Sequence, residues 1–83
     1  MTYYEFSGCS LSYQLALTLT GGIELAHRQE HACDVTLYYL PGNFFVEVHR
    51  ARRTGEITRL RSFQHPALLE RYVRQVRLPE WLA

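Results

Sequence analysis

Metal-ligating side chains gather in one short stretch of the sequence. Residues 27–33 read HRQEHAC and offer the rings of His27 and His31 and the thiol of Cys33, with Cys9 as a distant fourth donor. Zinc prefers nitrogen and sulfur ligands, and an HxxxH spacing on a helix places both imidazoles on one face. Structural zinc sites, however, use two short-spaced ligand pairs, and only one is present here. We therefore expect solvent-facing turn histidines, with no metal and no cofactor.

Catalytic residue types are present, but no motif frames them. The chain contains Ser, Cys, His, Asp and Glu, yet it has no strained nucleophile turn and no glycine-rich oxyanion loop. All nine basic residues are arginine, which excludes a Walker-type phosphate loop and Schiff-base chemistry, because both need a lysine amine. A chain of 83 residues also has little volume for a deep pocket. We expect a protein that is not an enzyme.

Arginines cluster in residues 49–61, which read HRARRTGEITRLR. Basic residues interleaved with aromatic ones on a sheet bind single-stranded nucleic acid in several small folds, by neutralising phosphates and stacking bases. Alternatively, such arginines pair with Glu and cover apolar surface with their stems. A net charge of only +1 favours this alternative. Nucleic-acid binding is therefore the second hypothesis, and its candidate residues are Arg50, Arg52, Arg53, Arg59 and Arg61.

Composition and charge describe one globular domain spanning residues 1–83. The chain is 47% hydrophobic and 20% charged. Residues 1–49 hold one arginine against five acidic residues, a net charge of −4, whereas residues 50–83 hold eight against three, a net of +5. No stretch has the roughly 20 apolar residues of a membrane-spanning helix, and no signal-peptide pattern opens the sequence. We expect a cytoplasmic protein with free thiols and no membrane association.

Three runs in the second half have the composition of β-strands. Residues 34–40, 44–51 and 56–63 are rich in β-branched and aromatic residues, and the turn signals PGN and RTG separate them. A three-residue RTG loop pairs Glu47 with Arg61, whereas a two-residue loop would oppose like charges, so we prefer the former. It also pairs Arg52 with Glu56, Val48 with Leu60 and Phe45 with Phe63.

A turn at Pro41-Gly42 sets the expected register of the first two of these strands. It pairs Tyr39 with Phe44, Leu37 with Val46 and Val35 with Val48. All six side chains should then lie on one face, which we expect to be the core against which a C-terminal helix packs.

Helices are expected near both ends of the chain. Apolar residues in 66–78 recur with helical spacing between Pro66 and Pro79. Residues 11–20 alternate well enough for a strand, but Ser12 as an N-cap and Gly21-Gly22 as a stop favour a short helix, followed by a strand over 23–28. The expected fold is α+β, an antiparallel meander of three to four strands with a C-terminal helix and a short N-terminal helix.

Several of these segments carry a family resemblance. The stretches GGIELAHR, VTLYYLPGNFFVEVHR and LLERYV resemble small uncharacterised bacterial proteins that share a Leu-Tyr before a tight turn, then Phe-x-Val-Glu-Val, over residues 20–78. The shared pattern is structural and implies no activity. His27, His31, Asp34 and the arginines of 50–53 lie outside it.

The second face of the expected sheet is too apolar for water and too polar for a second core. A second copy of the chain would cover it and bring the acidic half of one copy near the basic half of the other. The leading hypothesis is therefore a non-enzymatic interaction module that forms a homodimer. Its expected interface residues are Tyr38, Leu40, Phe45, Ile57 and Phe63.

Overall fold

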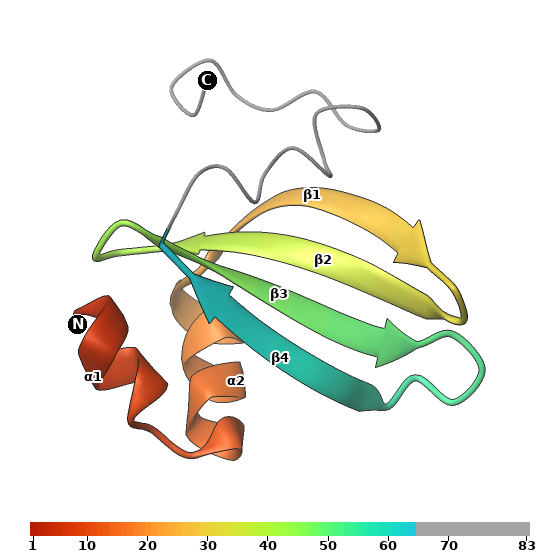
Figure 1. Cartoon of the computed structure of the whole chain (residues 1–83), viewed down its shortest axis with the longest axis horizontal. Helices are drawn as coiled ribbons and strands as arrows, with labels where there is room; N and C mark the ends of the chain where they lie inside the picture. Colours follow the sequence, from red (N-terminus) through yellow and green to blue (C-terminus); the bar gives the residue numbers. More distant parts are fainter. Residues whose placement is uncertain (65–83) are drawn as a thin grey trace.

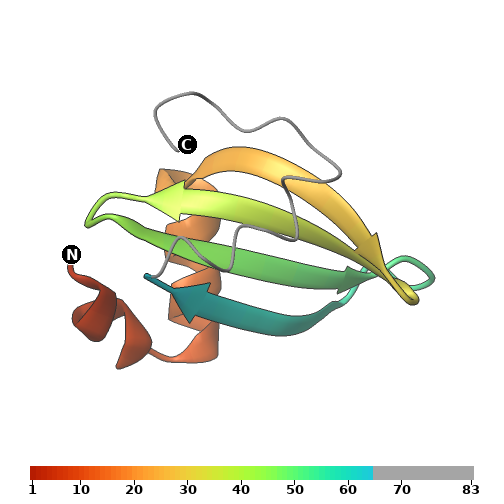
Figure 2. The same cartoon turned by 45° about the horizontal axis from the view of Figure 1, so that its top comes forward.

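The computed structural model describes residues 1–64, in which two short helices lie on one side of a four-stranded antiparallel sheet (Figures 1 and 2). The strands follow one another across the sheet in sequence order, which confirms the expected meander. The expected helix over 66–78 lies outside the described residues. In chain order the elements are α1 (Tyr3–Ser7), α2 (Leu11–Gly21), β1 (Ile23–Glu30), β2 (Cys33–Leu40), β3 (Phe44–Ala51) and β4 (Ile57–Phe63).

Helix α1 begins at a capping box that the sequence analysis missed. The Thr2 hydroxyl oxygen accepts a hydrogen bond from the Glu5 backbone N–H at 3.1 Å, and a Glu5 carboxylate oxygen accepts one from the Thr2 N–H at 2.9 Å. The Thr-x-x-Glu spacing of residues 2–5 is the signal that predicts such a start. The helix buries Phe6, whose ring centre lies 5.0 Å from that of Phe44 on the sheet.

Helix α2 resolves the ambiguity of residues 11–20 in favour of a helix. Its N-cap is Ser10, not the expected Ser12, because the Ser10 hydroxyl accepts from the Tyr13 N–H at 3.3 Å. Its C-cap is Gly22, where an added Cβ would lie 2.6 Å from the Thr18 carbonyl oxygen, so the backbone would have to shift to accept a larger residue. Neither described helix has the length and apolarity needed to cross a membrane.

The turn between β2 and β3 takes three residues, 41–43, instead of the expected two. Gly42 and Asn43 both have positive φ angles, of 106° and 59°, and Leu40 pairs with Phe44 across the turn. Glycine and asparagine are the residues that adopt this conformation at the lowest cost.

The longer turn moves the β2–β3 register by one residue, so that residues expected to share a face lie on opposite faces. Leu37 pairs with Glu47, and Val35 pairs with His49. The expected pairing is therefore wrong, and so is the expected core face made of Val35, Leu37, Tyr39, Phe44, Val46 and Val48.

The expected register of β3 and β4 is confirmed over most of its length. Its confirmed pairs are Phe45 with Phe63, Glu47 with Arg61 and Val48 with Leu60. The register shifts next to the turn, where Arg50 pairs with Ile57 and the ladder ends. The expected pair of Arg52 and Glu56 is not part of the ladder.

The sheet has a buried apolar cluster on each face. On the helix face, Phe6 packs against Leu40, Phe44, Val46 and Val48. On the second face, the cluster consists of Ala26, Leu37, Phe45 and Phe63. Every residue of β3 from 44 to 49 is buried, so this strand is covered on both sides.

Candidate functional site

The five residues expected to form a dimer interface do not share a surface. Tyr38, Leu40 and Ile57 lie on the helix face, whereas Phe45 and Phe63 belong to the cluster on the second face. Leu40, Phe45 and Phe63 are buried, and the other two are half-buried. Their grouping on one face is wrong, and the cause is the one-residue register shift at the β2–β3 turn. An exposed contact surface must be sought elsewhere in the described residues.

Three of the candidate arginines lie in or beside the β3–β4 hairpin end, and two of them have local partners. Arg50 donates from Nη1 to the Gly55 carbonyl oxygen at 2.8 Å. Arg52 donates to the His31 carbonyl oxygen and lies 3.8 Å from an Asp34 carboxylate oxygen. Arg53 is exposed in the turn.

The other two candidate arginines lie on the opposite face of the sheet from Arg50. Arg59 pairs with His49 on β3, and Arg61 pairs with Glu47. Residues 1–64 contain six arginines and six acidic residues, so the described part of the chain has no net charge apart from histidine. The five arginines therefore do not form one basic face. Their arrangement does not support the hypothesis of a surface that binds nucleic-acid phosphates.

The three candidate metal ligands are not brought together. His27 lies on the helix face, with its Nδ1 3.2 Å from the Thr36 hydroxyl oxygen and its Nε2 2.5 Å from a Glu24 carboxylate oxygen. His31 is exposed in the β1–β2 turn, and Cys33 points to the second face. Among residues 1–64, no three His, Cys, Asp or Glu side chains are arranged to hold a metal ion.

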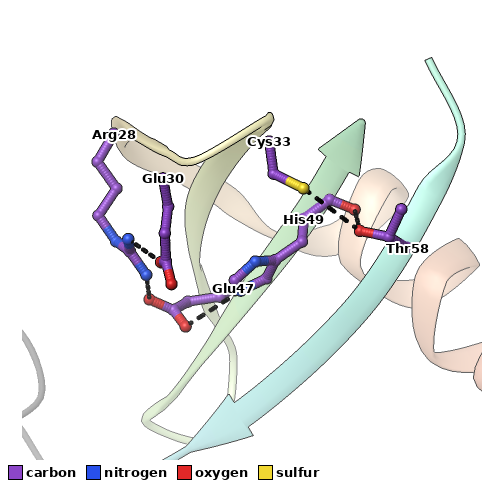
Figure 3. Close-up of polar contacts among 6 residues, drawn as sticks. All are labelled: Arg28, Glu30, Cys33, Glu47, His49 and Thr58. Atoms are coloured by element: carbon purple, nitrogen blue, oxygen red, sulfur yellow. Dashed lines mark hydrogen bonds and ion pairs between the residues drawn. The ribbon is translucent and has the colours of Figure 1, made fainter. Parts of the chain in front are cut away.

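A buried charged network on the second face is a feature that the sequence analysis missed (Figure 3). Arg28 Nη2 lies 3.3 Å from Glu47 Oε2, and the same guanidinium contacts the carboxylate of Glu30. His49 Nε2 lies 3.6 Å from Glu47 Oε1. The side chains of Arg28 and Glu47 are only 6% and 3% exposed.

This network suits a structural role better than a catalytic one. The Arg28 guanidinium compensates the buried Glu47 carboxylate. Removing one partner of such a buried pair leaves an uncompensated charge that is strongly destabilising. Glu47 and His49 are only 2% and 7% exposed, so neither presents its side chain at the surface. The network joins β1 to β3 across β2, so it stabilises the order and register of these strands (Figure 3).

The outer side of α2 is the described surface best suited to bind another protein. Tyr13 and Leu19 on this side are exposed by 52% and 49%. Ser12, Ala16 and Thr20 are exposed as well and recur every four residues, so they lie along one line of the helix. No charged residue and no histidine occurs between Glu5 and Glu24. A solvated helix normally carries charges on its outer face, and this one has none.

Comparison of the chain with protein-family models, with curated proteins and with solved structures gives no match.

Proposed function

We propose that the protein is a non-enzymatic interaction module that forms a homodimer through the outer side of α2. The observation that carries this proposal is an exposed helix surface that bears Tyr13 and Leu19 and no charge. Burying such side chains against a partner removes apolar surface from water, which is the main driving force of protein association.

A second copy of the chain is the partner that the charge pattern favours. In a twofold contact, every residue near the axis meets its own copy, so a charged residue there would face a like charge. The outer side of α2 avoids this cost because it is uncharged. Elsewhere, the described part of the chain mixes six arginines with six acidic residues, and a self-contact there would oppose like charges more often.

The spacing of residues on α2 also fits a twofold axis beside Ala16. Tyr13 and Leu19 lie three residues to either side of Ala16, so in an antiparallel helix pair Tyr13 of one copy meets Leu19 of the other. Ser12 and Thr20 lie four residues to either side and are small enough to let the two helices approach closely. The arrangement thus supports an interface built from the same residues on both copies.

The substitution Ala16→Glu tests the proposal. Ala16 is exposed and glutamate is a good helix former, so the fold should remain while two like charges meet at the axis. We expect size exclusion with light scattering to give the mass of two chains for the wild type and of one chain for the variant, with unchanged circular dichroism.

The substitution Ala32→Glu is the matched control, since it makes the same change at an exposed position in the β1–β2 turn. It should leave the dimer intact. A wild-type mass of one chain at micromolar concentration would rule out the homodimer. If both variants remain dimeric, the contact lies on another surface and the assignment to α2 is wrong.

A further inference from the structure

The helix face of the sheet contains an open groove beyond the part that α1 and α2 cover. The groove has a volume of about 730 Å³ and lies over β1, β2 and β3. This volume falls within the range of about 300–1,000 Å³ that is usual for small-molecule sites. The polar side chains that line it on this face are His27, Gln29, Asp34, Thr36, Tyr38 and Arg50.

The lining side chains offer both donors and acceptors of hydrogen bonds, and on the helix face the charges of Asp34 and Arg50 balance. Arg28 also lines the groove, but its guanidinium contacts the carboxylates of Glu30 and Glu47. Gln29 pairs with Asp34 across β1 and β2, and Asp34 pairs with Arg50 across β2 and β3, so one carboxylate and one guanidinium lie on neighbouring strands. Arginine only donates, an ionised carboxylate only accepts, and glutamine does both. A groove with this balance attracts neither a polyanion nor a cation by its net charge.

Several lining side chains are held in place by neighbours. Arg50 uses one N–H on the Gly55 carbonyl oxygen at 2.8 Å, which fixes the direction of its other donors. The His27 ring lies between Glu24 and Thr36, within hydrogen-bond distance of both. A site whose side chains are already ordered loses less conformational entropy when a ligand binds.

Tyr38 supplies the aromatic surface of the groove and is half-buried. Burial raises the pKa of its phenol, the carboxylate of Glu24 raises it further, and Arg50 partly opposes both. The hydroxyl group therefore keeps its proton at neutral pH and acts as a hydrogen-bond donor. The ring beside it can pack against the C–H face of a ligand.

We propose that this groove binds a neutral, hydroxyl-rich ligand of the size of a short oligosaccharide. Sugar hydroxyl groups donate and accept together, which matches the mixed lining, and their lack of charge matches the balance between Asp34 and Arg50. None of the lining residues belongs to α2, so this proposal and the proposed homodimer can fail independently.

Amide NMR spectra of the isotope-labelled protein test the proposal with maltotriose, cellotriose and chitotriose as probes. We expect at least one trisaccharide to shift amides of residues 27–29, 34–38 and 48–50 with millimolar affinity. The substitution Asp34→Ala removes a charged acceptor and should weaken this binding about tenfold or more. Gln29→Ala, at an exposed position, is a second variant and should weaken it too.

The matched control is Glu56→Ala, which removes an exposed carboxylate outside the groove and should leave the affinity unchanged. Failure of all three trisaccharides to shift these amides overturns the proposal. It is also overturned if a single-stranded oligodeoxythymidine shifts the same amides and the sugars do not, because the ligand would then be an anion.

Discussion

At the scale of single residues, the capping box of Thr2 and Glu5 links the stability of α1 to pH. Hydrogen bonds from Thr2, first from its backbone N–H and then from its side chain, hold the pKa of Glu5 below its ordinary value of 4.5. A carboxyl group with a lowered pKa in the folded state stabilises the fold above the unfolded value, and this contribution is lost as the pH falls through the folded pKa.

The substitution Glu5→Gln should remove this pH dependence, because glutamine keeps the capping hydrogen bond but does not titrate. We expect the wild type to lose stability relative to the variant as the pH falls below 4.5, since only the wild-type cap becomes protonated. Urea unfolding at neutral and acid pH measures this difference in stability. It reports on α1 because Phe6 of this helix packs in the buried cluster of the helix face. Parallel pH curves for the two proteins would contradict this account of the cap.

The buried network of Arg28, Glu30, Glu47 and His49 could not be predicted from the sequence. Arg28 and Glu47 are 19 positions apart, and nothing in their local patterns marks either as buried. Glu47 was expected to be a cross-strand partner of Arg61, which the structure confirms, yet its carboxylate also reaches Arg28 beyond β2. A contact between side chains of β1 and β3 depends on the packing of the whole sheet. Pairing neighbouring strands two at a time therefore does not predict it.

At the scale of elements, the β2–β3 turn depends on one glycine. Gly42 has a φ of 106°, and a Cβ added there would lie 2.3 Å from the Met1 carbonyl oxygen. The substitution Gly42→Ala should therefore lower the free energy of unfolding by more than about 1 kcal/mol, from backbone strain alone.

Gly21→Ala is the matched control in the same urea unfolding experiment. Gly21 lies in α2, and a Cβ added there meets no atom within 4 Å. Because alanine is the better helix former, this variant should be as stable as the wild type or up to about 1 kcal/mol more stable. Equal stability of Gly42→Ala and the wild type would show that the turn tolerates a side chain and that its conformation is not the one described.

The two hairpin turns show how far the elements could be predicted from the sequence. The β3–β4 register followed from charge, because the alternative placed Arg50 opposite Arg59. The β2–β3 register had no such constraint, since apolar residues occur at both odd and even positions of β3 and either register buries them. Asn43 was the available signal, because asparagine adopts a positive φ readily and so extends the Pro-Gly turn to three residues.

At the scale of the whole molecule, both faces of the sheet carry buried apolar residues. Its helix face packs against α1 and α2, and its second face is buried as well. The sequence pattern indicates that both faces are apolar, but periodicity shows which residues avoid water and not what covers them. A partner chain on the second face is therefore a hypothesis that the pattern alone cannot test. With both faces buried, the exposed apolar residues of α2 became the better candidate for contact with a second copy.

A charged substitution on either face of β3 should therefore unfold the protein. Val46 is 0% exposed on the helix face and Phe45 is 4% exposed on the second face, so Val46→Asp and Phe45→Asp each bury an unpaired carboxylate. We expect each to lower the free energy of unfolding by more than about 4 kcal/mol, enough to abolish the cooperative urea transition. Thr54→Asp, in the exposed β3–β4 turn, is the control and should unfold like the wild type. If Phe45 instead lay at a dimer interface, Phe45→Asp would give a folded single chain, and light scattering beside circular dichroism separates these two outcomes.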